Sequence, residues 1–157
     1  MCSLYNYSIL KKNKRADRMK SILKDNIHVL ERVEDWKDAV RKSGKILLEN
    51  QSIEERYIEA AIKNIEKLGN YVVITDNVAM PHARPEDGVN QTSLSLLLIK
   101  EGVDFLGENV NLVFMLASKD NSSHIEVIRK LSQLVDDEEV VEKMSFAKNK
   151  EEILNYL

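Results

Sequence analysis

Apolar residues recur in two rhythms along the chain, and each rhythm predicts one kind of secondary structure. Between residues 35 and 69 they repeat at three- and four-residue spacing, which predicts two amphipathic helices. Between residues 71 and 117 they gather in short, nearly continuous runs, which are typical of strands buried on both faces. Helical spacing returns after residue 123. The order therefore predicts two helices, then strands, then further helices.

Start signals mark the two leading helices. Asp35 precedes the first, and Asp38 follows three residues later, which is the spacing of a capping box. Ser52-Ile53-Glu54-Glu55 has the same spacing and predicts the start of the second helix. Gly69 stands where a residue in the left-handed conformation would end it. Trp36 falls on the apolar stripe of the first helix, so we predict that it packs in the core.

Four apolar runs predict the strands of a sheet. They are residues 27–30, 71–75, 92–99 and 112–117, with residues 103–105 as a further short extended piece. Strands this apolar need helices over both faces. We therefore predict an α/β fold, a three-layer α/β/α sandwich with a mixed central sheet in a single domain.

The C-terminal third predicts three helices. Ser123-His124-Ile125-Glu126 forms a third capping box, and apolar residues at helical spacing follow it to about residue 136. A short helix is expected over residues 139–144 and a last one over residues 149–156. Asn149 and Glu152 stand at the cap and N3 positions of that last helix.

Composition supports an ordinary globular domain and narrows its partners. Of the 157 residues, 43% are hydrophobic and 31% are charged. The formal net charge of −3 argues against nucleic-acid binding, which usually needs a basic excess. The lone cysteine, Cys2, excludes an intrachain disulfide and fits a reducing compartment. No apolar run approaches the length of a membrane span or a leader, so we expect a cytoplasmic protein.

Residues 1–18 differ from the rest because they carry five basic residues and no strong periodicity. We predict that they form a flexible basic N-terminal extension ahead of a domain at residues 19–157. Three interpretations stay open: a flexible tail, a contact to a membrane or nucleic acid, and an upstream extension before a true start at Met19.

The segment VAMPHARP, at residues 78–85, is the first candidate for chemistry. Pro81 fixes its own φ and pushes Met80 into an extended conformation, so His82 sits on a stiff backbone. Arg84 adds a cation, and Pro85 with Gly88 turns the chain away. This pattern favours an exposed, reactive histidine that handles an anion. The alternative is a histidine in an ordinary loop at a strand end.

His124 is the second candidate, because it falls in the first turn of a predicted helix just after Ser123. Free backbone N–H groups and the helix dipole attract anions there and disfavour an imidazolium. A neutral His124 would suit a phosphoryl group on His82, with Arg84 adding a charge-assisted bond. The alternatives are a histidine that merely occupies a helix start, and a two-histidine metal site. The metal site has less support, because zinc usually takes three or four ligands.

Residues 79–83, AMPHA, resemble the active-site signature of the IIA components of the bacterial phosphoenolpyruvate-dependent sugar phosphotransferase system, of the mannitol/fructose type. The resemblance covers residues 19–157, including the SSHIEVIRKLSQL helix. Residues 78–89 look most like the L-ascorbate-specific branch. The resemblance implies a three-layer α/β/α fold, in agreement with the apolar pattern.

The resemblance also implies a phosphocarrier that needs no cofactor and no metal. The histidine matching His82 would accept phosphate from phospho-HPr, the general histidine phosphocarrier, and pass it to a cysteine of a IIB component, which serves a membrane IIC component. The histidine matching His124 would support the phosphohistidine, with Arg84 and Ser123 contacting the phosphoryl group. Many mannitol-type members carry an arginine where this sequence has Asn64, and a small residue where it has Thr75.

Two alternatives to transport remain on the sequence alone. The first is a regulatory module of the same fold, whose phosphorylation state controls a partner protein. The second is an anion-binding structural domain in which His82 is inactive.

Overall fold

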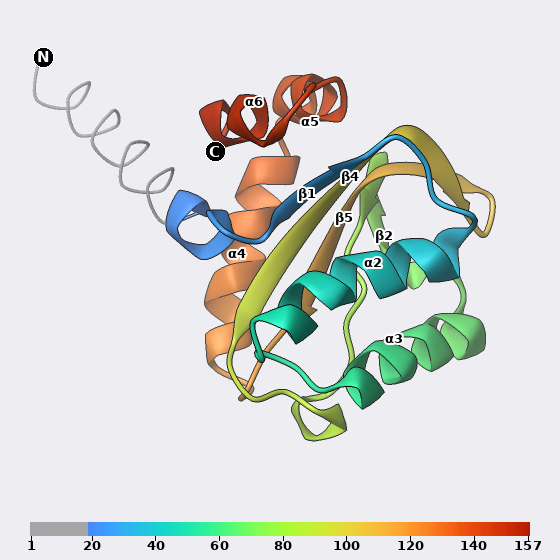
Figure 1. Cartoon of the computed structure of the whole chain (residues 1–157), viewed down its shortest axis with the longest axis vertical. Helices are drawn as coiled ribbons and strands as arrows, with labels where there is room; N and C mark the ends of the chain where they lie inside the picture. Colours follow the sequence, from blue (N-terminus) through green and yellow to red (C-terminus); the bar gives the residue numbers. More distant parts are fainter. Residues whose placement is uncertain (1–18) are drawn as a thin grey trace, which may run out of the picture.

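The computed structural model describes residues 19–157, except for the side chains of Ser123 and His124. The predicted extension at residues 1–18 lies outside the described residues, and the boundary before residue 19 stays a prediction. Residues 19–23 are helical. Five strands then form one sheet (Figure 1): β1 (Ile27–Leu30), β2 (Val73–Thr75), β3 (Asn77–Ala79), β4 (Ser93–Phe105) and β5 (Glu108–Ala117).

The sheet is mixed, as the pattern predicted. Its strand order is β1-β4-β5-β3-β2. β1 runs parallel to β4, and β3 runs parallel to β5, whereas the β4–β5 and β2–β3 pairs are antiparallel. Because β3 and β5 run parallel, their C-terminal ends lie side by side. The histidine loop begins at one of these ends, and the loop before α4 (Ser123–Val135) begins at the other.

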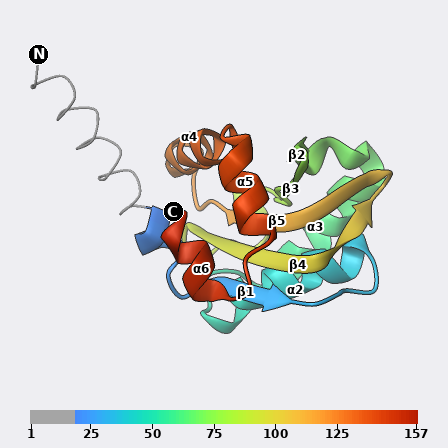
Figure 2. The same ribbon diagram turned by 90° about the horizontal axis from the view of Figure 1, so that it is seen from above.

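Helices cover both faces of this sheet, which confirms the three-layer prediction (Figure 2). α2 (Trp36–Glu49) and α3 (Glu55–Leu68) pack on one face, and α4 (Ser123–Val135), α5 (Glu138–Ser145) and α6 (Lys150–Asn155) on the other. In β4, Leu96 faces the second layer of helices and Leu97 faces the first, and both are fully buried. Within residues 19–157, no helix has the length and apolarity that crossing a bilayer requires.

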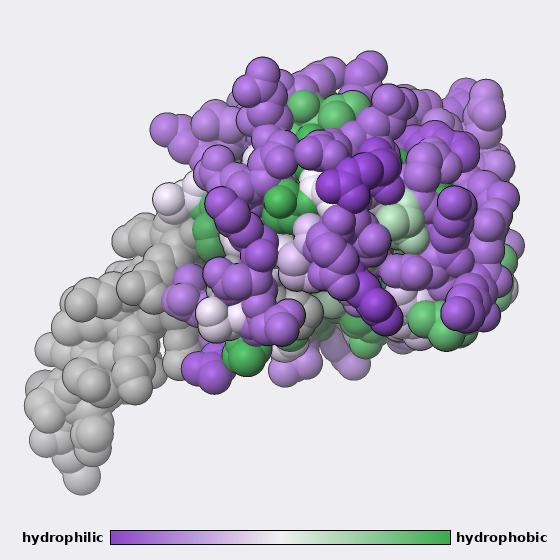
Figure 3. Space-filling view, turned by 90° about the horizontal axis from the view of Figure 1, so that it is seen from below, coloured by the Kyte–Doolittle hydropathy of each residue, from purple (hydrophilic) through white to green (hydrophobic). Residues whose placement is uncertain are grey.

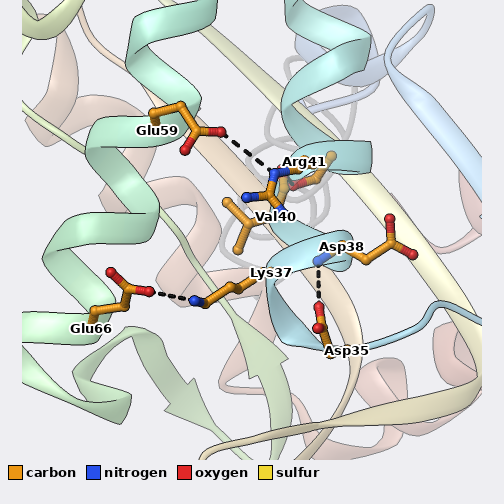
Figure 4. A network of polar contacts seen from close by, with 8 residues as sticks. Asp35, Lys37, Asp38, Val40, Arg41, Glu59 and Glu66 are labelled. Atoms are coloured by element: carbon orange, nitrogen blue, oxygen red, sulfur yellow. Dashed lines mark hydrogen bonds and ion pairs between the residues drawn. The ribbon is translucent and has the colours of Figure 1, made fainter.

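α2 and α3 approach each other closely at Gly44. A Cβ atom on Gly44 would lie 2.6 Å from Cγ1 of Ile58, so only glycine fits there without a shift of the Ile58 side chain. Figure 4 shows the polar side of the same helix pair, where two ion pairs join the helices: Arg41 with Glu59, and Lys37 with Glu66. The packing of α3 against α2 thus fixes where the last turns of α3 lie beside the sheet.

Two of the predicted helix caps are confirmed. The Asp35 side chain accepts from the backbone N–H of Asp38 at 2.8 Å (Figure 4). Asp38 accepts in turn from the N–H of Glu34 at 3.0 Å, one residue before the position that a capping box requires. The Asn149 side chain accepts from the N–H of Glu152 at 2.9 Å.

The capping box predicted at residues 52–55 is wrong. α3 begins at Glu55, and its N-cap residue, Glu54, makes no side-chain cap. Ser52 is buried, and its carbonyl oxygen accepts from the N–H groups of Asn90 and Gln91. The backbone at Ser52 is therefore hydrogen-bonded to the chain that follows the histidine loop. At α4 the N-cap is Ser122, one residue before the predicted cap.

The predicted buried strand over residues 71–75 is confirmed only as a strand over residues 73–75, and it is not buried. Residues Asn70–Val72 form a short 3₁₀ turn, and β2 begins only at Val73. β2 is an edge strand with Ile74 40% exposed, because it pairs with β3 alone. A tight turn, with Asn77 in the left-handed region at φ 67°, leads into β3. This short strand was not predicted, although the histidine loop follows it directly.

Two further strands are longer than the apolar runs suggested. Residues 103–105 continue β4 and residues 108–111 begin β5, so the two strands form one long hairpin. The last two helices lie within one or two residues of their predicted bounds, a difference that is usual at helix ends.

Candidate functional site

A cavity of about 360 Å³ lies beside the histidine loop, at the C-terminal ends of β3 and β5. The last turns of α3 line it through Asn64 and Leu68, together with Tyr71 and residues 82–85. The loop between β5 and α4 completes it through Ser118, Asp120 and Asn121. The structure thus brings His82 and the segment leading to His124 to one cavity.

The backbone of the histidine loop is anchored at four residues, two on each side of His82. The anchoring hydrogen bonds are these: Met80 N–H to Val72 O at 2.8 Å, Leu116 N–H to Pro81 O at 3.2 Å, Ala83 N–H to the Tyr57 hydroxyl at 3.0 Å, and Arg84 N–H to Asp87 Oδ2 at 3.0 Å. Met80 and Pro81 are buried, whereas His82 is only partly covered. A stiff, anchored loop therefore presents one half-exposed imidazole to the cavity.

The ring nitrogens of His82 have different environments. Nδ1 lies 2.9 Å from the carbonyl oxygen of Met80. A carbonyl oxygen only accepts hydrogen bonds, so Nδ1 carries a hydrogen and donates it. In the neutral ring, the lone pair is then on Nε2. The loop itself therefore selects the tautomer whose nucleophilic nitrogen is Nε2.

An aromatic side chain holds the same ring from the side. Tyr71 meets His82 edge-on, with ring centroids 5.8 Å apart and planes at 81°. Partial burial raises the pKa of Tyr71, so this phenol stays neutral near physiological pH. Tyr71 is 40% exposed and Leu68 is 63% exposed, which gives the cavity an apolar rim. Figure 3 shows the molecule from the side at which β5 ends and α4 begins, a mainly hydrophilic face with scattered apolar side chains.

Arg84 supplies the cation of this cavity. It is exposed and lies just before the short 3₁₀ turn Pro85–Asp87. Within residues 19–157, no carboxylate pairs with its guanidinium at ion-pair distance. Among the described residues, no carboxylate therefore competes for this guanidinium, and its contact with a phosphoryl group stays a prediction. Asn64, the residue at the expected arginine position, lines the same cavity without adding a charge.

Ser123 and His124 are the first two residues of α4, so the backbone of His124 lies in the first helical turn as predicted. Their side chains lie outside the described residues, and the predicted contacts with the phosphoryl group stay predictions. Among the residues that the structure describes, no three or more of His, Cys, Asp and Glu gather in a way that could hold a metal ion.

Two tyrosines of the site were not predicted. Tyr57 was assigned to the apolar stripe of the second helix, and it is indeed fully buried, but its hydroxyl reaches the histidine loop. Tyr71 was assigned to a strand. Helical spacing predicts that a residue faces the core. It does not predict which groups the hydroxyl of a buried tyrosine will contact.

Residues 20–157 match the family model described as the phosphoenolpyruvate-dependent sugar phosphotransferase system, EIIA 2. The chain belongs to this family. The resemblance noted in the sequence is thereby confirmed. Family members are phosphotransferases that act through a phosphohistidine, and this chain is such a IIA component.

Two relatives from Escherichia coli strain K12 share more than 30% of their residues with the chain. The mannitol-specific cryptic phosphotransferase enzyme IIA component is 36% identical over 134 residues, which cover 84% of this chain and 91% of that protein. The ascorbate-specific phosphotransferase system EIIA component is 31% identical over 136 residues, with 84% and 88% coverage.

Solved structures share the fold. The solution structure of the E. coli mannitol-specific cryptic enzyme IIA has a TM-score of 0.81 at 34% identity, with 88% and 97% of the two chains covered. Enzyme IIA for mannitol from E. coli, in complex with phosphorylated enzyme IIB, has a TM-score of 0.74 at 27% identity, with 84% and 93% coverage. The nitrogen regulatory protein IIA-Ntr of Neisseria meningitidis has a TM-score of 0.72 at 26% identity, with 88% and 97% coverage.

Proposed function

We propose that this IIA component is a cytoplasmic phosphoryl carrier in which His82 takes a phosphoryl group from phospho-HPr and passes it to a cysteine of a IIB component. The observation that carries the proposal is the environment of His82. Its Nδ1 donates to the Met80 carbonyl oxygen, and its ring lies at a cavity beside the Arg84 guanidinium, with which no carboxylate of the described residues pairs. Nε2 is therefore the phosphoryl acceptor.

The transfer needs no metal and no cofactor on this chain. In the first step the Nε2 lone pair attacks phosphorus, the Nε2–P bond forms, and the donor P–N bond breaks, returning its electron pair to the HPr imidazole. In the second step a IIB cysteine thiolate attacks phosphorus, the S–P bond forms, and the electron pair of the Nε2–P bond returns to His82. Positioning and charge are what the protein must supply.

Three groups are proposed to hold the phosphoryl oxygens. Arg84 offers a charge-assisted bond from the loop that carries the histidine. The first turn of α4, which begins at Ser123, offers backbone N–H groups, and a neutral His124 would donate a further hydrogen bond. One cation with neutral donors binds a dianion without trapping it, which suits a group that must leave again.

The cargo is proposed to be an ascorbate-like carbohydrate that enters through a membrane IIC component. Support comes from the sequence of residues 78–89 and from the ascorbate-specific relative. The mannitol-specific cryptic relative has the higher identity, so mannitol-type substrates are the comparison in any uptake assay.

The test is phosphorylation with phosphoenolpyruvate, enzyme I and HPr. We expect one acid-labile, base-stable phosphate per chain, lost in His82→Gln and kept in His28→Gln. His28 is a matched control, because it is exposed on β1, the edge strand on the far side of the sheet from β3 and the histidine loop. A wild-type chain that takes no phosphate would instead be an anion-binding domain with an inactive histidine. A label that persists in folded His82→Gln would contradict the choice of His82.

A regulatory role is the second candidate, favoured by the structural likeness to the nitrogen regulatory protein IIA-Ntr. Both roles need a phosphohistidine, so the acceptor separates them. Transfer from the phosphorylated chain to the cysteine of a purified IIB component supports transport. A phosphorylated chain that transfers to no IIB component supports control of a partner protein.

A further inference from the structure

Tyr57 connects the histidine loop to the end of β5 from inside the protein. It is the third residue of α3 and is fully buried. Its hydroxyl donates to the carbonyl oxygen of Leu116 at 2.5 Å and accepts from the N–H of Ala83 at 3.0 Å. Burial raises the pKa of Tyr57 to about 12, so the hydroxyl keeps the hydrogen that this arrangement needs.

Leu116 also bonds the other side of the loop. Its N–H donates to the carbonyl oxygen of Pro81 at 3.2 Å. The two neighbours of His82 are thus both tied to Leu116, Pro81 directly and Ala83 through the Tyr57 hydroxyl. The backbone on either side of the reactive residue is held by one rigid strand end.

We propose that Tyr57 is a positioning residue for phosphoryl transfer, which fixes the backbone of His82 so that Nδ1 stays on the Met80 carbonyl oxygen and Nε2 faces the cavity. The proposal rests on His82 being the carrier. Tyr57 does not line the cavity, so it acts through the loop and not on the phosphoryl group.

The physical reason lies in what a phenylalanine at position 57 would leave behind. The ring would still fill the core, but the partly buried Ala83 N–H and the buried Leu116 carbonyl oxygen would lose their shared partner. The loop would then gain freedom on one side of His82. Small errors in the placement of a reacting group are costly in transfer reactions.

The experiment compares Tyr57→Phe with Tyr156→Phe, a matched control near the C-terminus on the other side of the sheet. NMR of the ¹⁵N-labelled imidazole reports the tautomer of His82, and it needs no phosphate donor. In Tyr57→Phe we expect a mixture of tautomers in a folded protein. We also expect kcat for phosphoryl acceptance to fall about tenfold with KM for HPr unchanged, since the docking surface is intact.

Other outcomes decide against the proposal. An unchanged tautomer with kcat within about twofold of wild type would show that Tyr57 only fills the core. If the variant does not fold, the proposal is tested by measuring hydrogen exchange of the Ala83 amide in the wild-type protein. Exchange as fast as that of an unprotected loop amide would overturn the proposal. A wild-type chain that takes no phosphate would end the carrier proposal, while the tautomer comparison would still judge Tyr57.

Discussion

Nδ1 of His82 lies 2.9 Å from the carbonyl oxygen of Met80, only two residues back along the chain. The orientation of the imidazole is thus set by its own loop, and not by a distant side chain. A group attached to Nε2 leaves this hydrogen bond in place. We therefore expect this hydrogen bond to hold the ring in the same orientation before and after the proposed phosphorylation of His82.

This geometry predicts which phosphohistidine forms. We expect phosphorylation on Nε2 alone, because Nδ1 is protonated and faces the backbone. Two-dimensional ¹H–¹⁵N NMR of the phosphorylated chain distinguishes the two nitrogens. A phosphoryl group found on Nδ1 would mean that the ring turns over before transfer, and it would contradict the proposed nucleophile.

Removal of the Arg84 charge should slow phosphoryl acceptance. A charge-assisted hydrogen bond contributes about 1.5–3 kcal/mol, so Arg84→Gln should lower kcat/KM at least about tenfold. Arg84→Lys should recover part of this loss, because it restores the charge without the planar fork. Arg32→Gln serves as the control, since Arg32 is exposed near the β1 edge. An Arg84→Gln rate equal to that of the control would show that the phosphoryl group is held elsewhere.

A second cation in the cavity should trap the phosphoryl group. Asn64→Arg places a guanidinium on α3 at the same cavity as His82. We expect a longer-lived phosphohistidine and transfer to a IIB component slower by about tenfold, since each added charge-assisted bond must break before the group leaves. Asn64→Gln controls for the change in size. Faster onward transfer in Asn64→Arg would show that the wild-type cavity has too little positive charge for transfer, and would contradict the expectation that a second cation traps the phosphoryl group.

Acid should weaken the start of α2 through Asp38. Burial alone would raise the pKa of Asp38, but the hydrogen bond from the Glu34 backbone and the Lys42 ammonium outweigh it and hold the pKa below its ordinary value. A lowered pKa in the folded state gives stability that is present above the unfolded pKa and lost as the pH falls through the folded one.

The measurement is urea unfolding of wild type and Asp38→Asn across this range. We expect Asp38→Asn to lower the free energy of unfolding by about 0.5–1 kcal/mol at pH 7, since the group is near solvent. The difference should shrink as the pH falls through the lowered pKa of Asp38 and disappear once the pH is below it, where both side chains are neutral. Asp25→Asn, at an exposed aspartate, should show no such trend. A pH-independent difference for Asp38→Asn would assign the effect to shape and not to charge.

The layers of the fold were predictable because of the central strands. Leu96 and Leu97 point to opposite faces of the sheet and are both fully buried, so helices on one side alone could not satisfy the pattern. The sheet edge was not predictable. Val73 and Ile74 look as apolar as central residues, and only the pairing of β2 with a single neighbour leaves Ile74 exposed.

The site was predictable where local chemistry marks it. Pro81 and Arg84 around His82 stand out in the sequence. The strand that ends at this loop is the unpredicted β3, and not the apolar run at residues 71–75 from which a strand end was expected. The contribution of Tyr57 was not visible, because a hydroxyl that joins the histidine loop to the end of β5 depends on tertiary contacts. The Ser52 pattern was misleading for the same reason, since its backbone bonds lie 38 and 39 residues further along, at Asn90 and Gln91.

Both neighbours of His82 are attached to Leu116, and this affects how the chain can bind its phosphoryl donor and acceptor. On the proposed transfer through His82, we expect a loop held in this way to change its charge on phosphorylation but to keep its shape, so that donor and acceptor bind the same surface. We therefore expect the two to compete for that surface and to form no complex of all three proteins. Either partner in large excess would occupy the carrier unproductively, and flux would be greatest when the two are balanced.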